Sequence, residues 1–63
     1  MKNCIKKMRE EKRMTQEELA AKAGVTRVTI ISLENDEAYV TTTRTLVKVA
    51  DALGTSVDQI FLH

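Results

Sequence analysis

The stretch Thr15–Asn35 reads TQEELAAKAGVTRVTIISLEN and predicts two short helices joined by a tight turn. Thr15 and Thr26 each precede one of these helices, where a threonine side chain accepts a hydrogen bond from the backbone N–H groups of the first turn. Gly24 between them can adopt the positive φ that ends a helix. Helices this short are not stable alone in water. The rest of the chain must therefore serve largely to hold this helix pair.

The residues around the two caps strengthen this prediction. Glu18 lies three residues after Thr15 and completes a capping box. Each cap is also flanked by apolar residues at the spacing of a hydrophobic staple. These staple pairs are Met14 with Leu19 and Val25 with Ile30.

Length and composition limit the class of protein. The chain has 63 residues, which is one domain near the lower size limit for folding without disulfides or metals. The lone Cys4 excludes an internal disulfide and suits a reducing compartment. No apolar run approaches the roughly 20 residues of a membrane span, and the opening MKNCIKKMREEK is too charged for a signal peptide. We expect one soluble, cytoplasmic domain over residues 1–63, without membrane contact.

Composition and periodicity predict an all-α protein, a compact bundle of five short helices. The chain has no proline and only two glycines. The quoted stretch supplies helices over 16–23 and 27–35. Ahead of it, Asn3 is the expected N-cap of a helix over Cys4–Arg13, with Ile5 and Met8 on its inner edge.

Two more helices are expected after a loop over 36–43, with Thr41 or Thr42 as the cap of the first of them. That fourth helix has apolar residues at i, i+3, i+4 and i+7, and Gly54 ends it. Ser56 and Gln59 form a capping box that opens a short fifth helix. The apolar residues of the fourth helix are Leu46, Val49, Ala50 and Leu53, and the fifth helix is expected to end at Phe61 or Leu62.

Apolar residues crowd the single turn of the fifth helix, and one short helix cannot bury all of them inward. We therefore expect apolar surface there for a partner subunit. The expected homodimer contacts are Val57, Ile60 and Leu62, followed by Tyr39 and Val40 in the loop before the fourth helix.

The helix over 27–35 has two different faces. Ile30 and Leu33 point into the core. The opposite face combines one cation with hydrogen-bonding and β-branched apolar side chains, whereas a merely solvated helix usually carries Glu, Lys or Gln there. This composition favours a surface that contacts another molecule. Its residues are Arg27, Val28, Ile31, Ser32 and Asn35.

Charge is unevenly distributed along the chain. Residues 1–33 contain eight basic and four acidic residues, whereas residues 34–63 contain two basic and five acidic residues. The first part therefore carries +4 and the second −3. This asymmetry favours a polyanion bound by the N-terminal half, although a charge run is often an ordinary solvated helix face.

The sequence lacks the residue arrangements that catalysis or metal binding needs. The only histidine is the C-terminal His63, and Cys4 has no His or Asp placed to activate it. One Cys and one terminal His cannot form a structural zinc site, and there is no Gly-rich phosphate loop. We expect no enzyme activity, no metal, no cofactor and no small-molecule ligand.

These residues together resemble the phage repressor/Cro family of helix-turn-helix regulators, also called the xenobiotic-response-element type, which has the lambda repressor-like fold. The resemblance covers IKKMREEKRMTQEELAAKAGVTRVTIISLEN and, after the loop, LVKVADALGTSVDQIF. The family pattern has Gln opening the second helix, Leu-Ala within it, Gly at the turn, a small polar cap, and Ile and Glu in the recognition helix. The matching residues are Gln16, Leu19, Ala20, Gly24, Thr26, Ile30 and Glu34.

The resemblance implies that the helix over 27–35 enters the DNA major groove and touches base edges with its first residues. Arg27 suits a bidentate contact to guanine, and it equally suits a phosphate. Val28 and Ile31 would pack on thymine methyl groups or, alternatively, on another protein surface. Carried over by position, the base-reading residues are Thr26, Arg27, Val28, Ile31 and Ser32.

The same resemblance implies phosphate contacts from Gln16, Asn35 and Arg13, and an ion pair between Arg9 and Glu34 that links the first helix to the end of the third. The loop departs from the family pattern, because it carries two acids and neither Gly nor Pro. It either points away from DNA, or contacts DNA through other residues, or belongs to the dimer contact. The candidates for such DNA contacts are Tyr39, Thr42 and Arg44.

We therefore expect a sequence-specific regulator that binds double-stranded DNA, represses transcription by occupancy, and sits on the nucleoid when bound. Two subunits would read a palindromic operator. One alternative is a protein-interaction module on the same fold, such as an antitoxin-like partner. Another is a non-specific nucleoid-type DNA binder, against which the low net charge of +1 argues.

Overall fold

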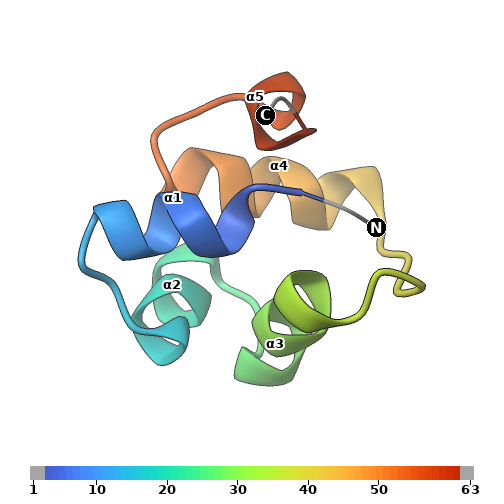
Figure 1. Cartoon of the computed structure of the whole chain (residues 1–63), viewed down its shortest axis with the longest axis horizontal. Helices are drawn as coiled ribbons and strands as arrows, with labels where there is room; N and C mark the ends of the chain where they lie inside the picture. Colours follow the sequence, from blue (N-terminus) through green and yellow to red (C-terminus); the bar gives the residue numbers. More distant parts are fainter. Residues whose placement is uncertain (1–2, 62–63) are drawn as a thin grey trace.

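The computed structural model describes residues 3–61, which form five α-helices and no strand (Figure 1). Helix α2 packs against α3 and α4, while α1 contacts α3, and α5 contacts α4. The expected all-α bundle, with the helix-turn-helix at α2 and α3, is confirmed. The helices are α1 (Ile5–Glu11), α2 (Gln16–Ala23), α3 (Arg27–Asn35), α4 (Thr43–Ala52) and α5 (Val57–Phe61).

Threonine hydroxyls cap three of the helices, as the sequence predicts for α2 and α3. The Thr15 hydroxyl accepts from the Glu18 backbone N–H at 3.0 Å, and the Thr15 N–H donates to Glu18 Oε1 at 2.8 Å, which completes the capping box. At α5, the Gln59 N–H donates to Ser56 Oγ at 3.3 Å, which is one of the two hydrogen bonds of the capping box expected there. The other threonine caps are Thr26 to the Thr29 N–H and Thr42 to the Thr45 N–H, both at 3.2 Å.

Helix α1 is shorter than the predicted Cys4–Arg13, and the prediction of its end was wrong. Arg13 lies outside the helix with a φ of 56°, in the left-handed region where Gly24 and Gly54 also lie. After each of these three residues, the next backbone N–H returns to the carbonyl five positions earlier, as in a Schellman motif. These bonds join Met14 to Arg9 at 3.1 Å, Val25 to Ala20 at 3.0 Å and Thr55 to Ala50 at 2.9 Å. A sequence search for glycine finds the last two ends and misses the first.

The start of α1 is tied to the end of α3. The prediction of Asn3 as the N-cap was wrong by one residue, because the helix begins at Ile5 and Cys4 is its N-cap. Asn3 Oδ1 still accepts from the Ile5 N–H at 3.0 Å. The Asn3 side-chain amide also donates to the Leu33 carbonyl at 3.0 Å. That carbonyl belongs to the last turn of α3, where carbonyls have no partner within the helix. Asn3 therefore links the first helix to the third.

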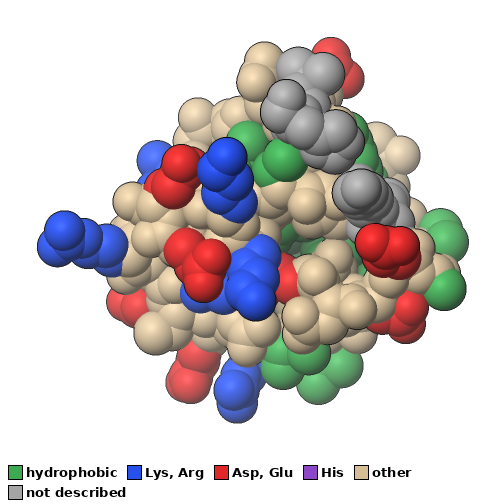
Figure 2. Space-filling model, viewed as in Figure 1, with side chains coloured by type: hydrophobic (Ala, Val, Ile, Leu, Met, Phe, Trp, Pro, Cys, Tyr) green, Lys and Arg blue, Asp and Glu red, His purple; other side chains and the backbone are tan. Residues whose placement is uncertain are grey.

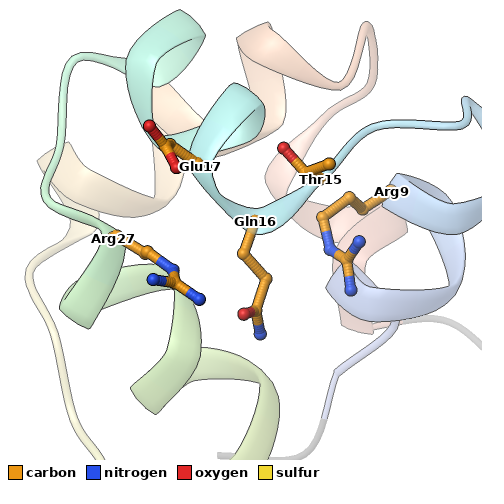
Figure 3. A pocket seen from close by; sticks show the side chains of 5 residues that line it. All are labelled: Arg9, Thr15, Gln16, Glu17 and Arg27. Carbon is orange, nitrogen blue, oxygen red and sulfur yellow. The ribbon is translucent and has the colours of Figure 1, made fainter.

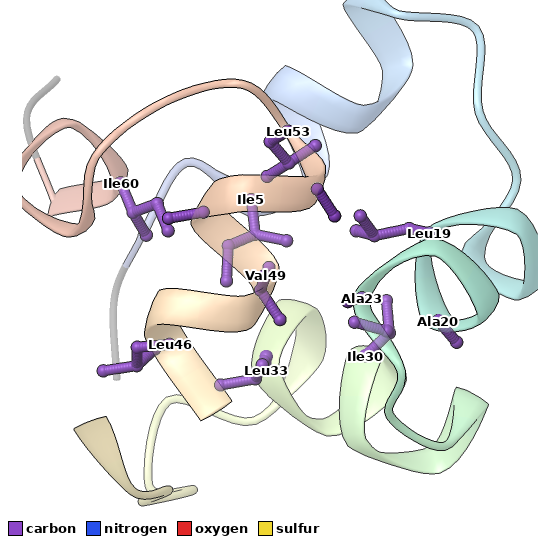
Figure 4. Packing of buried hydrophobic residues seen from close by; sticks show 12 residues of the cluster. Ile5, Leu19, Ala20, Ala23, Ile30, Leu33, Leu46, Val49, Leu53 and Ile60 are labelled. Carbon is purple, nitrogen blue, oxygen red and sulfur yellow. The ribbon is translucent and has the colours of Figure 1, made fainter. Parts of the chain in front are cut away.

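One apolar cluster fills the space between the helices (Figure 4). All five helices contribute to it, and Ile30 and Leu33 of α3 are buried as predicted. Ile60 is also part of this cluster and is fully buried. The prediction that Ile60 contacts a partner subunit was therefore wrong, because its side chain is already used within one chain. The twelve buried residues are Ile5, Leu19, Ala20, Ala23, Ile30, Leu33, Leu46, Val49, Ala50, Ala52, Leu53 and Ile60.

The other predicted dimer residues differ in exposure. Val57 and Tyr39 are half-buried and pack against the core, so Tyr39 is less exposed than the sequence suggests. Val40 is 81% exposed. Leu62 lies outside the described residues. Val47 on α4, which the sequence analysis did not select, is 43% exposed.

The capping box makes a testable contribution to stability. The hydrogen bonds from Thr15 hold the pKa of Glu18 below its ordinary value. A carboxylate with a depressed folded pKa stabilises the protein above its unfolded pKa, and this contribution is lost as the pH falls through the folded value. We expect Glu18→Gln to lose less stability than the wild type between pH 7 and pH 3, measured by urea unfolding.

The matched control is Glu17→Gln, which removes a charge from the same turn and leaves both capping bonds in place. It separates the effect of the capping bonds from the general stabilisation of negative charge by the helix dipole at the N-terminus. Parallel pH profiles for Glu18→Gln and the wild type below about pH 4.5 would contradict the prediction.

Candidate nucleic-acid interface

Helix α3 presents the face that the sequence analysis selected. Ile30 is fully buried on its inner side. On the outer side Val28 is 70% exposed and Arg27 is exposed beside it, at the N-terminal end of the helix. Ile31 and Ser32 follow on the same side and are half-buried. Figure 2 shows hydrophobic side chains gathered at the lower edge of the molecule, over α3, with a basic side chain next to them.

Thr26 and Asn35 lie at the two ends of this face, and both are exposed. The Thr26 hydroxyl already caps the helix and lies 2.9 Å from the Thr29 hydroxyl. If Thr26 contacts DNA, its hydroxyl has to make that contact in addition to, or in place of, these hydrogen bonds at the start of α3. Asn35 is the last residue of the helix, one turn beyond Ser32.

Behind this face lies the ion pair that the resemblance implies. Arg9 Nε donates to Glu34 Oε2 at 2.7 Å, and Arg9 Nη2 donates to Glu34 Oε1 at 3.2 Å. The Glu34 side chain is fully shielded from solvent and the Arg9 side chain is 11% exposed. The hydrogen bond to Glu34 raises the pKa of Arg9 above its ordinary value, so the guanidinium stays charged. The pair joins α1 to the end of α3 with two parallel bonds.

Two further contacts enlarge this pair into a network, and no sequence signal pointed to them. Arg9 Nη1 donates to the Met14 carbonyl at 2.6 Å and so holds the turn between α1 and α2. Gln16 Nε2 donates to Glu34 Oε1 at 3.1 Å, which ties the start of α2 to the end of α3. The two partners of this last contact are 18 positions apart, and neither residue type predicts the other.

An open hollow of about 440 Å³ lies between these elements (Figure 3). Gln16 lies between Arg9 and Arg27, and all three side chains line the hollow together with Thr15 and Glu17. Two guanidinium groups near a side-chain amide provide hydrogen-bond donors of the kind that bind a phosphate oxygen. The structure thus brings Gln16 and Arg27 together, although they lie on different helices.

The remaining predicted contacts are more scattered. Arg13 is exposed at the turn after α1 and does not line this hollow. In the loop after α3, Asp36 Oδ1 accepts from the Ala38 N–H at 2.9 Å, and the Asp36 carbonyl accepts from the Tyr39 N–H at 3.0 Å. Asp36 therefore builds a turn, which gives this acidic residue a structural role where the family pattern has Gly and basic residues.

Within residues 3–61, no group of His, Cys, Asp and Glu side chains is placed to hold a metal ion. The same part of the chain contains no helix long and apolar enough to cross a membrane.

The sequence profile of the helix-turn-helix family matches residues 5–60, which is nearly the whole chain and includes α2, α3 and the Arg9–Glu34–Gln16 network. The chain belongs to this family. It is a helix-turn-helix protein of the xenobiotic-response-element, or Cro, type, a family of DNA-binding transcription regulators and not of enzymes.

A curated relative agrees with this assignment. The chain is 38% identical over 63 residues to an uncharacterized HTH-type transcriptional regulator of Methanocaldococcus jannaschii. The alignment covers 100% of this chain and 94% of the relative. The two proteins are therefore similar over almost their full lengths.

Solved structures agree on the fold. A chain in the complex of the SinR and SinI proteins superimposes with a TM-score of 0.82 at 36% identity, over 89% of this chain and 54% of that chain. The apo form of HppE superimposes with a TM-score of 0.77 at 33% identity, over 92% of this chain and 32% of that chain. This helix-turn-helix chain thus spans about half of the first protein and a third of the second.

Proposed function

We propose that this helix-turn-helix protein is a sequence-specific repressor that binds an approximately palindromic operator as a homodimer. Each subunit would place α3 in a major groove, with half-sites about one helical turn apart. Occupancy of a promoter would then block transcription. The observation that carries the proposal is the outer face of α3. Arg27 is exposed there and Val28 is 70% exposed, while the opposite face of the helix is buried in the core.

The chemistry of this face supports base reading. Arg27 suits the acceptor pair of guanine, and the apolar side chains of Val28 and Ile31 suit thymine methyl groups. Ser32 adds a hydroxyl that can donate or accept. A surface with one charge and several methyl groups favours specificity over general phosphate attraction, because non-specific affinity comes chiefly from phosphate neutralisation.

Phosphate contacts would come from Gln16 at the start of α2, Asn35 at the end of α3 and Arg13 in the turn after α1. Dimer contacts are proposed at Val40 and at the half-buried Val57 and Tyr39. Val40 is the most accessible of these to a partner subunit, since it is 81% exposed.

Arg27→Ala tests which kind of contact Arg27 makes. If Arg27 reads a base, we expect affinity for the operator to fall by about 1–3 kcal/mol and the preference at one base pair to relax. If it binds a phosphate, all duplexes should weaken alike, and the salt slope should fall by about one. Fluorescence anisotropy with the operator and single-base variants at several salt concentrations distinguishes the two.

The matched control for this experiment is Lys48→Ala, which removes one exposed positive charge from α4. It should change operator affinity much less than Arg27→Ala does. Equal binding of the wild type and Arg27→Ala to every duplex would contradict a role for Arg27 at the interface.

A further inference from the structure

We propose that Glu34 is a positioning residue for DNA binding, because it turns the Gln16 side-chain amide so that an N–H faces a DNA phosphate. This inference rests on the proposed function. It gives the Arg9–Glu34 pair a second role besides holding α1 against α3.

The geometry around Glu34 fixes the orientation of the amide. Glu34 Oε1 accepts from Gln16 Nε2 at 3.1 Å and from Arg9 Nη2 at 3.2 Å, and its side chain has no exposed area. An ionised carboxylate only accepts hydrogen bonds. The opposite orientation of the amide would place Gln16 Oε1 against another acceptor. Glu34 therefore selects the orientation in which the NH₂ group faces the network.

That orientation suits an anion in the hollow. A side-chain NH₂ group carries two N–H donors, and the contact with Glu34 uses one of them. Gln16 is only half-buried and lies between Arg9 and Arg27 in the hollow (Figure 3). The second N–H, flanked by these guanidinium groups, is thus available to a phosphate oxygen. A phosphate offers only acceptors, so an amide turned the other way would repel it.

Fixing the side chain in advance also strengthens binding. A glutamine that is free in the unbound protein loses rotamer freedom when it binds, and this loss weakens the complex. Gln16 is already held at its amide by Glu34. A protein that folds normally but lacks this contact should therefore bind DNA less tightly.

A thermodynamic cycle on DNA affinity tests the proposal. Its variants are Gln16→Ala, Glu34→Asp and the double variant, where Glu34→Asp keeps the charge and withdraws the carboxylate by one methylene. We expect Gln16→Ala to raise the operator Kd about tenfold, because a hydrogen bond to a charged group is lost. We expect Glu34→Asp to raise the Kd by a similar factor and the double variant to be no weaker than Gln16→Ala alone.

Two losses that multiply in the double variant would overturn this inference and leave the proposed function intact. Absence of DNA binding by the wild type would overturn the proposed function and this inference with it. Thermal unfolding of each variant shows that the affinities refer to folded protein.

A second measurement decides the matter if Glu34→Asp does not fold. Gln16 and Gln59 are the two glutamines of the chain, and Gln59 is exposed. The side-chain ¹⁵N order parameter of Gln16 should lie near that of a rigid backbone, about 0.85, while that of Gln59 should lie below about 0.6. A Gln16 amide as mobile as that of Gln59 would overturn the proposal.

Discussion

Replacing Glu34 with alanine is expected to remove much or all of the protein's stability. The substitution leaves the Arg9 guanidinium, which is 11% exposed, without its carboxylate partner. Removing one partner of a buried pair costs about 3–5 kcal/mol. A domain of this size has a total stability of roughly 3–9 kcal/mol, so the loss removes much or all of it. Guanidinium unfolding followed by circular dichroism measures the change.

The control for this prediction replaces both partners with apolar residues of similar size, as Arg9→Met with Glu34→Leu. Such double replacements are often neutral. Here we expect most of the stability to return but not all of it, because the Met14 carbonyl and Gln16 also lose their bonds to the pair. A Glu34→Ala protein within about 0.5 kcal/mol of the wild type would contradict the structural role of the pair.

A loss of DNA binding by Glu34→Ala would therefore not by itself show that Glu34 contributes to the DNA interface. An unfolded variant binds no operator, whatever Glu34 does in the folded state. Only the milder Glu34→Asp substitution separates the support of the fold from the positioning of Gln16.

Ile60→Ala is expected to destabilise the single chain by about 2–5 kcal/mol, because it leaves a cavity in the core. Ile60 has no exposed area, and its carbonyl also accepts from the Cys4 N–H at 2.7 Å, so α5 is bound into the bundle at this residue. Urea unfolding at two protein concentrations measures the effect. The loss should be the same at both, since it arises within one chain.

The matched substitution is Val40→Ala, at a position that is 81% exposed. It should change the stability of the single chain by less than about 0.5 kcal/mol. If Ile60→Ala left stability unchanged and weakened dimerisation instead, the assignment of Ile60 to the core would be contradicted.

The helix-turn-helix and Ile60 differ in how well the sequence alone predicts them. The helix-turn-helix was predictable because its signals are local: Thr15 and Thr26 cap helices within three residues, and Gly24 supplies the left-handed turn. The burial of Ile60 was not predictable, because four apolar residues share one turn and only the packing of α5 on α4 decides which of them points inward.

The end of α1 and the Gln16 contact were missed for related reasons. Arg13 takes a conformation that costs an L-residue about 1–2 kcal/mol, and here the bond from the Arg9 guanidinium to the Met14 carbonyl helps to hold it. The contact between Gln16 and Glu34 exists only because α2 and α3 cross near these residues. Hydrophobic periodicity predicts which face of a helix is buried, and it does not predict which side chains of two different helices form a hydrogen bond.

Selection of bound sequences from a random pool of duplexes tests whether the protein reads a DNA sequence through α3. We expect enrichment of one approximately palindromic sequence, with half-site centres about 10 base pairs apart and the strongest preference at the bases facing Arg27 and Val28. Recovery of unenriched random duplexes would contradict sequence-specific operator binding by α3, and so would the absence of any bound duplex at physiological salt.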